Sequence, residues 1–107
     1  MIVTTTHAIE ERRVTDYLGV VHGCAVMGSN LFRDFFANIR DVVGGRVGSY
    51  ETVLSDAKDA ALTDLVARAE AMHADAVIGV SFDSDSIGGD NKTILMVSAT
   101  GTAVRLG

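Results

Sequence analysis

His22 and Cys24 carry the two side chains of this 107-residue chain that are best suited to bind a metal ion together. They stand two positions apart in a stretch that predicts a strand, so both are expected on one face. Imidazole and thiolate suit a soft ion such as zinc or copper. They supply only half of a tetrahedral site, so other ligands must come from elsewhere or from another copy. The simpler interpretation, which we favour, makes Cys24 a small buried residue and His22 a core or interface histidine.

Catalytic chemistry is not indicated by the sequence. A nucleophilic Cys24 needs a nearby base and a lowered thiol pKa, and the three histidines are scattered along the chain. No nucleophile-elbow motif is present. The sequence therefore favours a protein that is not an enzyme, and we assign it no catalytic residue.

Two glycine-containing segments could bind ions but have simpler explanations. The run GGRVGS at 44–49 can cradle an anion through backbone amides before a helix, or it can simply connect two helices. The segment DSDSIGGDN at 83–91 resembles the start of a calcium loop, but its twelfth position is Ile94 instead of glutamate. We therefore predict a solvated hairpin loop over 83–91.

Length and composition predict one domain, residues 1–107, that associates with copies of itself. A net charge of −5 without a basic cluster argues against nucleic acid as a partner. The longest uncharged stretch, 17–32, is too short and too polar to span a membrane. One cysteine excludes an internal disulfide, and a lone thiol with no signal peptide predicts a cytoplasmic protein. Because 48% of residues are hydrophobic in so short a chain, surplus apolar surface should be buried between subunits.

The order of predicted elements is β-β-α-α-β-β, which indicates an α+β fold with a mostly antiparallel sheet packed against helices. Strands are expected at 1–5, 17–27, 76–82 and 93–106. Helices are expected at 31–43 and after Ser49, a candidate N-cap. The second helix should present an apolar face formed by Leu54, Ala57, Ala61, Leu65, Ala69 and Met72. Alternate glycines in the 17–27 strand should let a backbone or helix approach closely.

Charged residues flank the phenylalanine stripe of the first predicted helix. Arg33 and Arg40 are seven positions apart, as are Asp34 and Asp41, so each pair forms a row along the helix. These rows either face solvent or meet opposite charges on another subunit and fix its register.

Three separated motifs resemble the YbjQ-like family. They are GSNLFRDFFANIRDVVGGRVGSYE (28–51), HADAVIGVSFD (73–83) and MVSATGTAV (96–104), and VTTT (3–6) and YLGVVHG (17–23) fit as well. The resemblance covers essentially the whole chain. It implies a dodecin-like α+β subunit that assembles as a homopentamer, in a biochemically uncharacterised family that carries a heavy-metal-binding label.

The residues matched to the family signature imply structural and interface roles, and His22 and Cys24 lie outside that signature. We therefore expect a non-catalytic, homo-oligomeric protein, a pentameric ring that holds a small ligand at its subunit interfaces. The alternative is a heavy-metal protein whose zinc or copper sites, built from His22 and Cys24, are completed by symmetry. The signature falls on Asn30, Arg33, Asp34, Arg40, Asp41, Gly44, Gly45, Arg46, Tyr50 and Glu51, then on Ala74, Asp75, Ala76 and Gly79.

Overall fold

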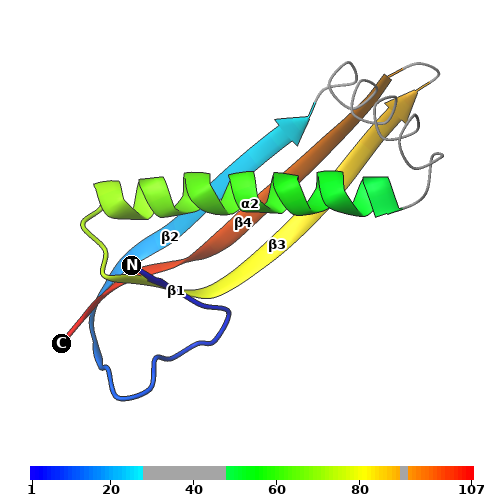
Figure 1. Cartoon of the computed structure of the whole chain (residues 1–107). Coiled ribbons are helices and arrows are strands. Elements are labelled where there is room, and N and C mark those ends of the chain that lie inside the picture. Colours follow the sequence, from blue (N-terminus) through cyan, green and yellow to red (C-terminus); the bar gives the residue numbers. More distant parts are fainter. Residues whose placement is uncertain (28–47, 90–91) are drawn as a thin grey trace.

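The described part of the chain folds into a four-stranded sheet with a helix packed across one of its faces (Figure 1). The computed structural model describes residues 1–27, 48–89 and 92–107. Its elements are β1 (Ile2–Val3), β2 (Val14–Met27), α2 (Gly48–Ala71), β3 (Ala76–Gly89) and β4 (Lys92–Leu106).

The sheet has the strand order β1-β3-β4-β2, in which the β1–β3 pair is parallel and the other two pairs are antiparallel. Strands of 14 or 15 residues rise by about 3.3 Å per residue. They therefore account for the long dimension of a molecule measuring 52 × 23 × 18 Å. Among the described residues, no helix is long and apolar enough to cross a membrane.

The predicted α+β class and the mostly antiparallel sheet are confirmed. The predicted helix over 31–43 lies outside the described residues. The strand predicted from residue 17 begins earlier, at Val14. The helix predicted after Ser49 begins at Gly48, so Ser49 lies inside its first turn and is not the N-cap.

The hairpin loop predicted over 83–91 is wrong for residues 83–89. β3 continues to Gly89 and pairs with β4 without interruption from Ser81, opposite Thr100, to Gly89, opposite Lys92. Aspartate, serine and glycine are depleted in strands, which made the segment resemble a loop. Pairing with the adjacent strand overrides that local preference and places Asp83 and Asp85 on the sheet.

The core lies between α2 and the face of the sheet that it covers. Every fourth residue of α2 from Val53 onward is fully or almost fully buried, so these residues form one continuous stripe along the helix. The sequence predicted Leu54 as the first member of this face, but the buried residue is Val53, and Leu54 is only partly buried. The stripe consists of Val53, Ala57, Ala61, Leu65 and Ala69, and it packs in one cluster with Val21, Leu95, Val97, Ala99 and Ala103 of the sheet.

Gly23 of β2 is the point of closest approach between the sheet and the helix. A Cβ atom built on Gly23 would overlap the carbonyl oxygen of Ala61 and the backbone nitrogen of Leu65. The prediction that alternate glycines admit a helix is therefore confirmed at this position.

Helix α2 ends in a Schellman motif with His73 in the left-handed conformation. The Ala74 amide donates to the Ala69 carbonyl at 3.1 Å, and the His73 amide donates to the Glu70 carbonyl at 3.0 Å. His73 has a φ of 60°, a conformation normally taken by glycine at this position.

We expect His73→Gly to stabilise the fold by about 0.5–1 kcal/mol, because glycine adopts a positive φ without the Cβ penalty. Urea unfolding at fixed protein concentration measures the change. His73→Ala is the control, since alanine keeps the penalty and should leave the midpoint nearly unchanged. Equal stability of the glycine and alanine variants would contradict the left-handed conformation assigned to His73.

Candidate functional site

The face of the sheet opposite α2 carries the side chains that the sequence singled out for metal binding. β2 places His22 and Cys24 there, and both are exposed. The interpretation of Cys24 as a buried residue and His22 as a core residue is therefore wrong for this chain by itself, because α2 packs on the other face. Val20, Val26 and Met96 on the same face are 73%, 59% and 42% exposed. We call this surface the open face: Val20, His22, Cys24, Val26, Met96, Ser98, Thr100, Asp83 and Asp85.

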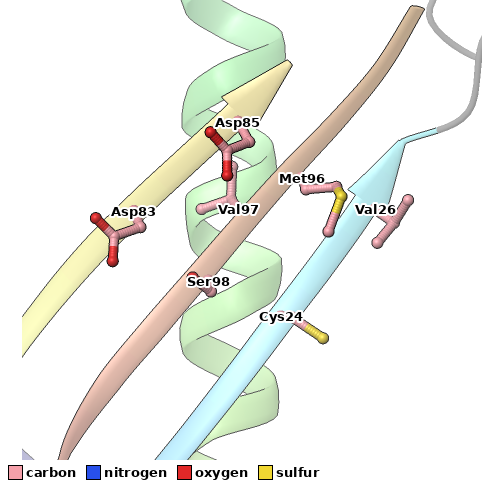
Figure 2. A pocket seen from close by; sticks show the side chains of 7 residues that line it. All are labelled: Cys24, Val26, Asp83, Asp85, Met96, Val97 and Ser98. Atoms are coloured by element: carbon pink, nitrogen blue, oxygen red, sulfur yellow. The ribbon is translucent and has the colours of Figure 1, made fainter. Parts of the chain in front are cut away.

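A small pocket of about 90 Å³ lies on the open face, where β2, β4 and β3 run side by side (Figure 2). The side chains that line the pocket form two rows, and each row contains residues that lie opposite one another on β2, β4 and β3. Cys24 lies opposite Ser98, which lies opposite Asp83. Val26 lies opposite Met96, which lies opposite Asp85. The pocket thus combines a thiol, a thioether, a hydroxyl and two carboxylates, and its lining is Cys24, Val26, Asp83, Asp85, Met96, Val97 and Ser98.

A polar cluster closes the outer edge of β2 beside this pocket. Asp64 of α2 accepts a hydrogen bond from the Cys24 backbone amide at 3.1 Å. Arg68, one turn along the helix, lies 3.4 Å from the same carboxylate. Its Nη1 atom lies 3.3 Å from Nε2 of His22. The Asp64 carboxylate therefore accepts a hydrogen bond from a backbone N–H of β2 that would otherwise have no partner at the edge of the sheet.

The pKa of Asp64 is lowered from its ordinary value of 3.8. The hydrogen bond from the Cys24 amide is the largest cause, and the charge and hydrogen bond of Arg68 and the charge of His22 act in the same direction. Partial desolvation of the carboxylate opposes them. The ionised form of Asp64 is therefore the one that this cluster stabilises.

Asp64 should make the stability of the fold depend on pH. Because its pKa is lower in the folded than in the unfolded chain, its contribution is fully present above about pH 4 and is lost as the pH falls through the lowered pKa. We expect Asp64→Asn to be less stable than the natural protein at neutral pH, and the gap to narrow at about pH 3. Thermal unfolding of both proteins across this range measures the gap. A difference in stability between the two proteins that does not change with pH would contradict the lowered pKa of Asp64.

The described residues do not complete a metal site around His22 and Cys24. Both side chains occupy the same face, as predicted, but Nε2 of His22 lies beside the Arg68 guanidinium. Within residues 1–27, 48–89 and 92–107, no three His, Cys, Asp or Glu residues come together in a group that could hold a metal ion. The half-site of His22 and Cys24 therefore stays a prediction that depends on a second copy.

Most of the predicted interface residues lie outside the described part of the chain, namely Asn30, Arg33, Asp34, Arg40, Asp41, Gly44, Gly45 and Arg46. Tyr50 and Glu51 lie in the first turn of α2, where the Glu51 side chain is exposed. The second family motif has a structural role. Asp75 accepts a hydrogen bond from the Leu106 amide at 2.9 Å. Gly79 takes a φ of 62° where it bonds to the N-terminal segment.

Sequence reasoning missed the partners that surround Cys24. Asp64 and Arg68 have the i, i+4 spacing of a helix ion pair, but that spacing does not reveal which strand lies beneath them. Asp83 and Asp85 alternate with serine in the period of a strand, and that signal could have placed them on one face. Met96 had no signal beyond its place in a predicted strand.

The fold and the open face thus define a small α+β protein in which α2 covers one sheet face and no other described helix covers the opposite one. The chain belongs to the YbjQ family, described as "Putative heavy-metal-binding", whose profile matches residues 1–107. A crystal structure of a DUF74-family protein of unknown function from Pediococcus pentosaceus is similar to it with a TM-score of 0.66. The two sequences are 17% identical over 100% of this chain and 98% of that one, so this likeness supports the fold alone.

Proposed function

We propose that this protein is a non-catalytic subunit of a homo-oligomer that buries its open face between copies and holds a small ligand there. The observation that carries the proposal is the exposure of Val26 and Met96, which lie opposite each other, and of Val20 further along β2, on a sheet face that α2 does not cover. Exposed apolar surface gathered on one face of a protein marks interaction sites.

The free energy of burial favours association through this face. Full burial of a valine or methionine side chain contributes about 1.5–3 kcal/mol. These three side chains are partly exposed, so each retains a substantial share of that free energy for an interface. A closed ring repeats the gain in every copy. The ring of five copies that we propose rests on the family resemblance.

A charge placed on the open face tests the proposal. We expect Val26→Glu to lower the molar mass measured by light scattering, because assembly would bury the new carboxylate without a partner. Thr63→Glu is the matched control, since Thr63 is exposed on α2. It should assemble as the natural protein does. Retention of the full assembly mass by Val26→Glu, with native circular dichroism, would contradict the proposal.

A second candidate function is soft-metal binding, favoured by one observation. The Cys24 thiol and the Met96 thioether line the same pocket. Thiolate and thioether select ions such as Cu(I), and the family description points to heavy metals. We propose that such an ion would be held by Cys24 and Met96, or by Cys24 and His22, with further ligands from a second copy.

Elemental analysis after loading with Cu(I) or Zn²⁺ and gel filtration tests this candidate. We expect at least one ion per assembly, and its loss from the His22→Ala, Cys24→Ala double variant. Loss from Met96→Leu but not from His22→Ala would identify the thioether as the second ligand. Less than one ion per assembly in the natural protein would contradict the candidate.

A further inference from the structure

Arg68 connects the helix-covered side of the sheet to the imidazole of His22 on the open face. β2 is an edge strand, so a side chain of α2 can pass around its outer edge. Nη1 of Arg68 lies 3.3 Å from Nε2 of His22 and is hydrogen-bonded to it. The same guanidinium lies 3.4 Å from the Asp64 carboxylate, which accepts a hydrogen bond from the Cys24 amide at 3.1 Å. The guanidinium is therefore held from both sides.

The direction of the hydrogen bond between Arg68 and His22 determines where the imidazole carries its proton. A guanidinium can only donate hydrogen bonds, so Nε2 of His22 must accept through its lone pair. An uncharged imidazole has one such lone pair, and its other ring nitrogen carries the proton. The hydrogen bond thus requires the proton of His22 on Nδ1, and it leaves the imidazole no lone pair for a metal ion.

A metal ion on either nitrogen of His22 would break this arrangement. An ion on Nε2 must displace the Arg68 guanidinium, whose positive charge also repels it. An ion on Nδ1 requires the proton to move to Nε2, where it would face the N–H donors of Arg68. The hydrogen bond is lost in both cases, so Arg68 weakens the binding of a metal ion by His22.

The sulfur ligands of the open face do not have this restriction. Cys24 is a free cysteine, and its thiol lines the same pocket as the Met96 thioether (Figure 2). Thiolate and thioether select soft ions such as Cu(I), whereas zinc is commonly bound by thiolate together with imidazole. If Arg68 withholds the imidazole, the two sulfur atoms are left, and they favour Cu(I) over zinc.

We propose that Arg68 determines the metal specificity of the open face: it withholds the His22 imidazole and leaves Cys24 and Met96 as the ligands of a soft monovalent ion. The inference rests on the soft-metal function proposed above, and it chooses between the two ligand pairs given there. The position of the proton on His22 does not depend on a metal, so it can be measured in the metal-free protein.

Long-range proton–nitrogen NMR correlation spectra of the metal-free protein, recorded where the imidazoles are uncharged, locate that proton. We expect it on Nδ1 of His22 in the natural protein. This preference should be lost in Arg68→Leu, because the hydrogen bond of one ring nitrogen sets the protonation of the other. His7, which lies beside Gly79, is the internal control and should not change. A proton on Nε2 of His22 in the natural protein, or an unchanged His22 spectrum in Arg68→Leu, would overturn the proposal.

Competition titrations with a chromophoric chelator measure metal affinity separately. We expect Arg68→Leu to bind Zn²⁺ roughly tenfold more tightly than the natural protein, the lower end of what a hydrogen bond to a charged group contributes. The gain should vanish in the Arg68→Leu, His22→Ala double variant. Equal zinc affinities of Arg68→Leu and the natural protein would overturn the proposal.

Cu(I) titrations separate the failure of this inference from the failure of the function on which it rests. We expect Met96→Leu to weaken the binding of Cu(I) and His22→Ala to leave it unchanged. No Cu(I) binding by the natural protein would refute the soft-metal function, and the metal specificity with it. Binding of Cu(I) that is weakened by His22→Ala would refute only the role assigned to Arg68.

Discussion

Gly23→Ala is expected to destabilise the fold by about 3 kcal/mol or more, since overpacking against fixed backbone is at the upper end of its usual range. The added methyl group would overlap backbone atoms of Ala61 and Leu65, and neither can move as a flexible side chain can. The helix would have to lift from the sheet and expose part of the core between them.

Urea unfolding followed by circular dichroism at one fixed protein concentration measures this effect, because association couples stability to concentration. Cys24→Ala is the neighbouring control. Its side chain points away from α2, so the change should stay within about 0.5 kcal/mol, as for an exposed position. A Gly23→Ala variant as stable as this control would show that α2 does not contact β2 at this glycine.

Leu65→Ala is expected to cost about 3 kcal/mol, the typical loss for a fully buried leucine. Leu65 is fully buried, and its α2 neighbours in the buried stripe, Ala61 and Ala69, are too small to fill the space that it would leave. The cavity would remain at the centre of the contact between helix and sheet.

Leu65→Met separates the effect of volume from that of position. A methionine of similar volume should cost less than about 1.5 kcal/mol. The same unfolding measurement compares both variants with the natural protein. Equal losses for alanine and methionine would indicate that the site does not depend on packing volume.

The sequence predicted those parts of the fold whose local signals agree with their final environment. The buried stripe of α2 follows the helical repeat from Ala57 to Ala69, and four of its members were predicted. The extension of β3 through Asp83 and Asp85 could not be predicted in this way, because only pairing with β4 keeps those residues in a strand. The end of α2 at His73 could not be predicted either, because a histidine in the left-handed conformation takes the place of the usual glycine.

The candidate site was predicted in part. The two-residue spacing of His22 and Cys24 correctly placed both on one face. It did not reveal that this is the face away from the helix, because both faces of β2 carry apolar residues. Asp64, Asp83 and Met96 come close to Cys24 from three other elements, and only the tertiary arrangement brings them together. The interface predicted around Arg33 and Arg40 remains a prediction.

The central claim, that copies of this chain associate, is tested most directly by native mass spectrometry of the unmodified protein. The method reports the number of subunits and the mass of any retained ligand in one measurement. We predict a single assembly at five times the 11.3 kDa chain mass, with any bound ligand as an added increment. A spectrum dominated by the 11.3 kDa monomer at micromolar concentration would contradict the account.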